Sequence, residues 1–201
     1  MSKKIIILSI IAFIVVVGAV VGTLWFINNN PWATNTKVDP TAVVPDLTED
    51  YGACNMLTKD QIVSALGSSA NNLGDAYNSG RIFSQGDTRS QFCRFSLGDN
   101  AETSNFKSMV TIYSQQHFID DAAKAFNDDT TVTKVAVSGN DGFFYIKKDE
   151  LQKTERFELT FYKGMNQYTF TLTQPLDSTM FNESSAKTAL TTLAGEAKLT
   201  Q

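Results

Sequence analysis

The sequence predicts an α+β domain, an antiparallel sheet packed by helices at its start, middle and end, preceded by one transmembrane helix. Three observations predict this class. Residues 5–27 carry no charge. After about residue 51, short segments of alternating apolar residues follow one another, as strands of a half-buried sheet do. Helical patterns occur at the beginning, middle and end of that region, which argues against repeated βαβ units.

The first element is the uncharged stretch at residues 5–27. A helix of this length reaches roughly 35 Å, enough to cross a hydrocarbon core of about 30 Å. Lys3 and Lys4 precede it, in a tail of residues 1–4, and the next basic residue is Lys37. The positive-inside rule predicts a single-pass anchor in the cell membrane, with a cytoplasmic N-terminus and an extracytoplasmic remainder. A cleaved signal peptide has a shorter apolar segment of about 7–15 residues, so we favour an uncleaved signal-anchor.

Gly18 and Gly22 form a small-xxx-small pair within this stretch. Such a pair allows two helix backbones to approach closely, which predicts a homodimer through the transmembrane helix. The alternative is that these glycines have no special role, because glycine is common in membrane helices.

Residues 28–50 are predicted to be an extracytoplasmic linker, because they are polar, contain three prolines and show no apolar period. The chain beyond the apolar stretch holds 15 basic and all 21 acidic residues, a formal charge of −6. Nucleic-acid binding requires a basic surface, so this charge argues against a nucleic-acid partner.

Residues 51–201 form the predicted extracytoplasmic domain. Thr58 and Gln61 have the spacing of a capping box, which starts a helix that Gly67 ends. The consecutive Phe143, Phe144 and Tyr145 require a cover over one face of their strand, either the final helix or a lipid or peptide partner. The remaining expected elements are strands at 91–97, 106–113, 131–137, 143–147, 156–163 and 167–173, and helices at 117–126 and 182–194 with Gly195 as C-cap.

Cys54 and Cys93 are the two cysteines of the chain. An even count in an oxidising compartment predicts one disulfide bond, closing a loop of about 40 residues. The competing interpretation is a pair of free or catalytic thiols, but the two do not form a C-x-x-C motif.

Several segments together resemble a known pattern. They are the run from Cys54 to Val63 with Gly67 after it, Cys93-Arg94-Phe95 at the start of a strand, and the run from Val135 to Gly142 before a short strand. The chain thus resembles actinobacterial cell-surface lipoproteins and extracellular sensor domains of unknown function, including the LpqN group with a PsbP/Mog1-like sandwich. The resemblance covers about residues 51–200. It implies a cysteine before the first helix, another in the first strand, and no established enzymatic activity. The predicted anchor replaces the lipidated cysteine of many members.

The residues indicate no catalytic chemistry. His117 is the only histidine and is expected to face solvent, which argues against a triad or a histidine-based metal site. The pairs Asp120–Asp121 and Asp128–Asp129 lack the spacing of a calcium loop. No nucleotide-binding motif occurs. We therefore expect no enzyme, no metal and no cofactor.

One candidate binding site remains. Arg81, Arg89 and Arg94 fall within 14 residues and, with Tyr77, could bind a small anion or a glycan. Alternatively, they solubilise a mobile loop, because residues 68–90 are rich in serine, asparagine and glycine.

The expected function is a non-catalytic, membrane-anchored domain that binds or senses an unknown ligand or protein of the cell envelope. The alternative is a structural accessory subunit of an envelope membrane complex, acting through its membrane helix.

Overall fold

The computed structural model describes residues 50–79, 83–85 and 88–199. The chain divides into two compact units, residues 1–44 and 45–201, and the described residues belong to the second. The predicted anchor at 5–27, with Gly18 and Gly22, and residues 28–49 of the predicted linker lie outside them. Within the described residues, no helix combines the length and the apolar character that membrane crossing requires.

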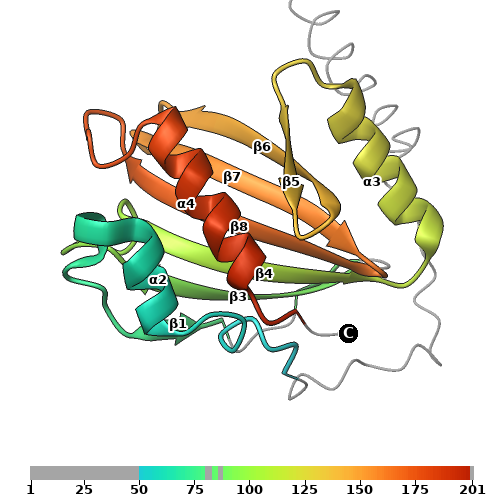
Figure 1. Ribbon diagram of the computed structural model, residues 1–201, viewed down its shortest axis with the longest axis horizontal. Coiled ribbons are helices and arrows are strands. Elements are labelled where there is room, and N and C mark those ends of the chain that lie inside the picture. Colours follow the sequence, from blue (N-terminus) through green and yellow to red (C-terminus); the bar gives the residue numbers. More distant parts are fainter. Residues whose placement is uncertain (1–49, 80–82, 86–87, 200–201) are drawn as a thin grey trace, which may run out of the picture. The chain divides into compact units, whose positions relative to one another are not determined.

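The described residues form an α+β fold, as predicted (Figure 1). Three α-helices stand at the start, middle and end of the element order, and every strand pairing is antiparallel. The helices are α2 (Lys59–Leu66), the short 3₁₀ helix η1 (Gly67–Ala70), α3 (Gln116–Asp128) and α4 (Glu183–Glu196). The strands are β1 (Ala76–Asn78), β2 (Phe83–Gln85), β3 (Thr88–Ser96), β4 (Asn105–Tyr113), β5 (Thr133–Val137), β6 (Asn140–Asp149), β7 (Thr154–Lys163) and β8 (Asn166–Pro175).

The strand order across the sheet is β1-β3-β4-β8-β7-β6-β5. Strand β2 also pairs with β3, at the end of β3 opposite to the end that pairs with β1. β5 therefore forms one edge of the sheet. Its hairpin with β6 turns at Ser138 and Gly139, whose positive φ angles of 47° and 81° are typical of the two-residue turns that match strand twist.

One face of the sheet, here called the inner face, is covered by α4 and α2 (Figure 1). Alternate residues of the central strands point to this face and are almost completely buried, among them Phe106, Leu159, Phe170 and Leu172. Leu190 and Leu193 of α4 are fully buried in the same core. The apolar alternation of each strand thus supplies the surface on which the helices pack.

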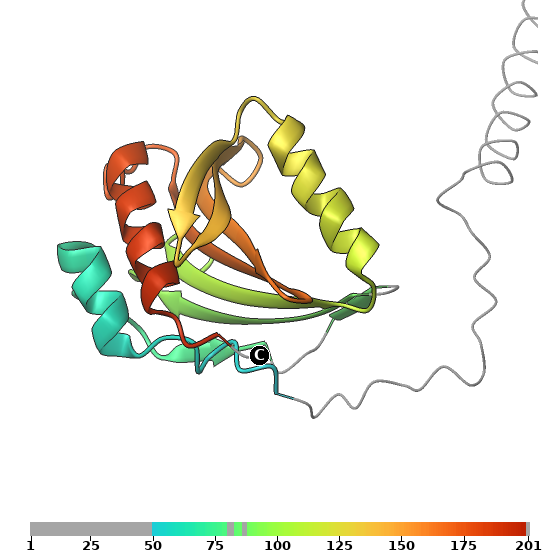
Figure 2. The same cartoon turned by 45° about the vertical axis from the view of Figure 1, so that its right-hand side comes forward.

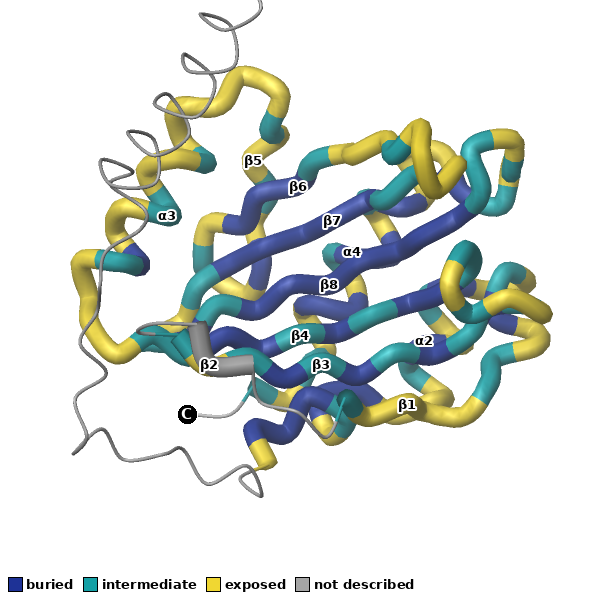
Figure 3. The backbone as a smooth tube through the Cα atoms, turned by 180° about the vertical axis from the view of Figure 1, so that it is seen from behind, coloured by how far each residue is buried: buried dark blue, intermediate teal, exposed yellow. Residues whose placement is uncertain are grey.

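The opposite face, here called the outer face, is seen in Figure 3. Helix α3 lies at one end of it, on the other side of the sheet from α4 (Figure 2). The Phe126 ring of α3 stacks on Phe143 and Tyr145 of β6, with centroids 5.2 and 5.3 Å apart. Phe144 points to the inner face, where Lys187 of α4 lies over its ring. The three consecutive aromatic residues are therefore covered on both faces by helices of the chain itself.

The capping box is confirmed. The Thr58 hydroxyl accepts from the Gln61 N–H, the Thr58 N–H donates to Gln61 Oε1, and Gly67 ends α2 with a positive φ of 57°. Two expectations were wrong. Residues 68–90 are not one loop, because β1, β2 and the beginning of β3 lie there. Gly195 is not a C-cap, because α4 continues through it to Glu196.

Candidate functional site

A disulfide bond joins Cys54 and Cys93, as predicted, with 39 positions of sequence separating them and their Cα atoms 4.9 Å apart. It fastens the segment before α2 to β3. Two side chains of the sheet hold the neighbouring Ala53: its N–H donates to Gln91 Oε1, and its carbonyl accepts from the Ser108 hydroxyl. This edge of the domain is thus fixed both covalently and by buried hydrogen bonds.

A polar pocket of about 210 Å³ opens on the outer face. It collects three cationic side chains from three strands, Arg94 of β3, Lys107 of β4 and Arg156 of β7. The strand register explains why they meet: Arg94 is the cross-strand partner of Lys107, and both Asn105 and Arg156 pair with Thr173. The other lining residues are Phe92, Glu102, Asn105, Gln152, Thr154 and Thr173.

Arg94 is held from two sides. Its Nη1 lies 2.8 Å from Glu102 Oε1, and its guanidinium lies 5.2 Å from the centroid of the Tyr77 ring. Its Nε is buried and has no hydrogen-bond partner in the part of the chain that the structure describes. A buried donor without a partner costs free energy, and an acceptor on a ligand would recover it.

Lys107 has no ion pair among the described residues, and its Nζ lies 6.0 Å from the centroid of the Phe92 ring. Burial lowers the pKa of Lys107. The charge of Glu158 opposes this shift, whereas the neighbouring Arg156, Arg94 and Lys147 lower the pKa further. The ammonium group is therefore short of negative charge, which an anionic ligand would supply.

Glu158 is a buried carboxylate beside this cluster of cations, and its charge partly compensates theirs. It accepts a 2.7 Å hydrogen bond from the Tyr145 hydroxyl, and Lys147 and Arg156 each approach it to 3.8 Å. Only about 8% of Glu158 is exposed. It therefore organises the cations while it remains outside the pocket lining.

The pocket suits the binding of an anionic group. Among the described lining residues, its three cations face a single carboxylate, Glu102, which Arg94 already engages and whose side chain is about 75% exposed. The amides and hydroxyls around the cations offer additional hydrogen bonds, and the Phe92 ring offers an apolar surface. Among the described residues, the lining includes neither a histidine nor a cysteine.

The structure brings together two of the four predicted site residues, Tyr77 and Arg94, which are cross-strand partners. Arg89 lies five residues from Arg94 on the same strand and therefore points to the opposite face of the sheet. Arg81 lies outside the described residues. Sequence reasoning missed Lys107 and Arg156, although both occupy outward positions beside the inward Phe106 and Phe157.

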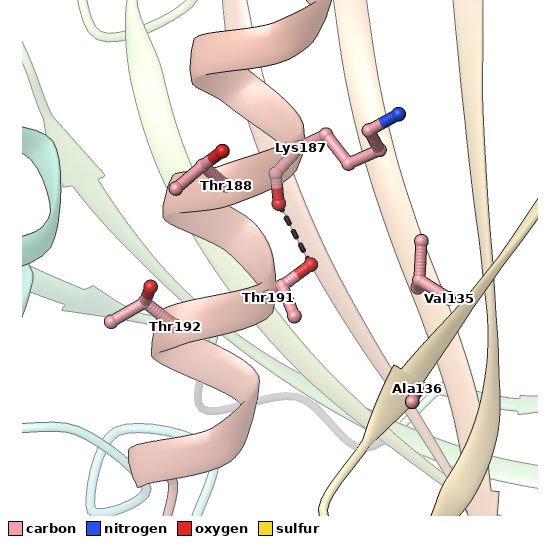
Figure 4. Close-up of a pocket in the computed structure, with 6 residues that line it drawn as sticks. All are labelled: Val135, Ala136, Lys187, Thr188, Thr191 and Thr192. Carbon is pink, nitrogen blue, oxygen red and sulfur yellow. Dashed lines mark hydrogen bonds between the residues drawn. The ribbon is translucent and has the colours of Figure 1, made fainter.

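A second pocket, of about 480 Å³, lies between β5 and α4 (Figure 4). Val135 and Ala136 line it from the strand, and Lys187, Thr188, Thr191 and Thr192 from the helix. His117 is exposed on α3, where its ring lies tilted against Phe118 with centroids 4.0 Å apart, and it lines neither pocket. No three potential metal-ligating side chains gather anywhere in the described residues.

Comparison with protein-family models and with curated proteins gives no match. Among solved structures, the chain is similar to a Bacteroides thetaiotaomicron protein with 12% sequence identity and a TM-score of 0.40. The similarity covers 63% of this chain and 42% of that one.

Proposed function

We propose that this chain is a non-catalytic domain, anchored outside the cell membrane by residues 5–27, that binds an anionic ligand of the cell envelope in the outer-face pocket. The observation that carries this proposal is the convergence of Arg94, Lys107 and Arg156 on one pocket with a single lining carboxylate. The disulfide supports an oxidising compartment, and the uncharged stretch after Lys3 and Lys4 supports the orientation.

The ligand chemistry follows from the groups present. Guanidinium groups form charge-assisted, often bidentate hydrogen bonds with carboxylates and phosphates. The Phe92 ring beside them offers a surface for a sugar or another flat group. A carboxylated or phosphorylated envelope saccharide combines both features. We also propose that the domain belongs with the LpqN-type surface proteins, a resemblance supported by the Cys54–Cys93 pair and the α+β fold.

The test is calorimetric titration of the full-length chain in detergent micelles with inorganic phosphate and, separately, with glucuronate. Each cation removed deletes a charge-assisted contact worth about 1.5–3 kcal/mol. Lys107→Met and Arg156→Gln should therefore each weaken binding at least about tenfold. Arg89→Gln is the matched control, because Arg89 lies on the same strand as Arg94 but on the opposite face. Failure of both probes to bind, or equal weakening by Arg89→Gln, would overturn the proposal.

The location is tested separately. Protease added to intact cells should digest residues 51–201, and thiol labelling should require prior reduction. A protected C-terminal region, or a mature chain that lacks its first thirty residues, would contradict the proposed anchor.

A further inference from the structure

The edge strand β5 leaves part of its backbone without a strand partner. Among the residues that the structure describes, it pairs with β6 only. In a two-residue hairpin the residues next to the turn form a hydrogen-bonded pair, so Val137, Val135 and Thr133 bond to β6. The N–H and C=O groups of Lys134 and Ala136 consequently point away from β6. No backbone hydrogen bond of either residue to another described segment occurs.

This edge lies beside the pocket between β5 and α4, because Ala136 is one of its lining residues. The pocket volume of about 480 Å³ lies within the range of about 300–1,000 Å³ that is usual for ligand sites. Figure 4 shows Lys187 and Thr191 on the side of α4 toward Val135 and Ala136, whereas the side chains of Thr188 and Thr192 point away from the strand. A groove between a free strand edge and a helix suits an extended peptide, whose backbone continues the sheet.

The β5–β6 hairpin turn lies close to the C-terminal end of α4. A Cβ atom at Gly195, near the end of α4, would lie 3.9 Å from the Ser138 hydroxyl in the hairpin turn. Lys187 lies eight residues earlier, roughly 12 Å along the helix from that end. An added strand antiparallel to β5 would therefore have its C-terminal end beside Lys187.

The charges beside the groove decide which extended peptides can bind there. Lys187 has no ion pair among the described residues, and its Nζ lies 6.0 Å from the centroid of the Phe144 ring. The described part of the lining contains this one cation and no carboxylate. Lys134 adds a second exposed cation on the edge strand itself. Both lysines favour a partner with a carboxylate and disfavour a basic one.

We propose that an extended peptide segment of a partner protein, with a carboxylate at its C-terminal end, adds antiparallel to the free edge of β5 and lies in the groove against α4. The backbones of Lys134 and Ala136 form up to four hydrogen bonds with it. Lys187 binds the carboxylate. This surface is separate from the outer-face pocket, because β5 and α4 contribute no residue to that pocket.

The probe is a fluorescent pentapeptide, threonine-valine-threonine-valine-aspartate with a free C-terminus, added to the full-length chain in micelles. Amide hydrogen exchange of Lys134 and Ala136 should slow at least tenfold on binding. The amides of Val135 and Val137, already bonded to β6, should change little. Two control peptides carry N-methyl groups on alternate residues. Only the peptide whose N-methyl groups replace the N–H groups that face β5 should fail to bind.

Four variants of the chain complete the test. Lys187→Met should weaken binding at least tenfold, whereas Lys187→Arg should retain it. Thr191→Trp, at a partly exposed position on the side of α4 that faces β5 in Figure 4, should fill the groove and abolish binding. Lys107→Met, in the other pocket, should have no effect. The proposal is overturned if the peptide fails to bind or binds without protecting Ala136. It is also overturned if the edge amides are protected in the free chain in a concentration-dependent way, which would identify a second copy as the occupant.

Discussion

Arg94 and Lys107 stand directly opposite each other on β3 and β4, with both side chains on the outer face of the sheet. Like charges in this arrangement destabilise a sheet. Glu102 relieves Arg94, whereas Lys107 has no ion pair among the described residues. The arrangement costs stability in the free protein, and an anion between the two side chains would reverse the sign of the interaction. This relationship is the physical basis of the first prediction.

Lys107→Met should stabilise the protein and weaken anion binding at least about tenfold. Removing the ammonium group eliminates both its desolvation and its repulsion by neighbouring cations, while methionine keeps the apolar stem. We expect the thermal midpoint at pH 7 to rise by about 2–4 °C, which corresponds to about 1 kcal/mol in a domain of this size. Calorimetry of the two proteins checks the midpoint. A lower midpoint in the variant would show that Lys107 contributes to stability.

The pH dependence of this difference has a defined sign. Because the folded-state pKa of Lys107 is lowered, the charged lysine destabilises the fold fully below that pKa. The penalty is relieved as the pH rises through the folded pKa toward the unfolded value of about 10.4. The stability advantage of Lys107→Met should therefore shrink between neutral pH and about pH 10. An advantage that is constant over this range would contradict the assignment.

Tyr145 should make the fold sensitive to alkali. Burial, followed by the charge of Glu158 and the hydrogen bond to it, raises the pKa of Tyr145 well above its usual value. A raised folded-state pKa contributes stability that is complete below the unfolded pKa of about 10 and is lost as the pH rises through the folded pKa. Unfolding in urea, measured from pH 8 to 11, should show stability falling above about pH 10.

Tyr145→Phe tests the same interaction at neutral pH. It leaves the buried Glu158 without its 2.7 Å hydrogen bond, at a cost of about 1.5–3 kcal/mol. It should also reduce the loss of stability in alkali. Tyr77→Phe is the control, because Tyr77 is exposed on the edge strand β1. Equal effects of the two substitutions would exclude a special role for the contact with Glu158.

The Cys54–Cys93 disulfide should contribute much of the stability of the domain. It closes a loop of about 40 residues, so the chain-entropy estimate is roughly 4 kcal/mol. Cys54→Ser with Cys93→Ser, or reduction of the wild-type chain, should lower the urea midpoint accordingly. The Ala53 amide, which donates to Gln91 Oε1, should then exchange faster than the amides of β7 and β8. Unchanged exchange of the Ala53 amide would show that the segment is held without the covalent bond.

Local sequence predicted those parts of the fold that local physics determines. The capping box at Thr58 is complete within four residues, and the alternation of Phe157, Leu159 and Phe161 marks the buried face of its strand. β1 escaped prediction because its three residues are all exposed and carry no apolar alternation. α4 passes through Gly195 because a glycine ends a helix only where the backbone adopts a left-handed conformation.

The pocket was only half predictable for a different reason. Tyr77 and Arg94 are close in sequence and proved close in space. Lys107 and Arg156 are 49 positions apart, and only the strand order β3-β4-β8-β7 brings them together. Arg89 is close to Arg94 in sequence but does not share the pocket. Because side chains alternate between the two faces of a strand, Arg89 points to the opposite face.

Phe126→Ala should release α3 from the sheet without unfolding the rest of the domain. Ile119 is the one fully buried side chain of this helix, and the Phe126 ring makes its aromatic contacts with Phe143 and Tyr145. Because Phe126 is only partly buried, we expect a cost of about 2 kcal/mol, below the 3–5 kcal/mol of a fully buried phenylalanine. A helix with few buried contacts can open locally while the rest of the domain stays folded. Amide exchange in α3 should therefore accelerate at least tenfold while β7 and β8 remain protected.

Ala125→Ser, at an exposed neighbouring position, should leave exchange in α3 nearly unchanged. Uniform acceleration across the sheet would instead show that α3 and the sheet unfold as one cooperative unit.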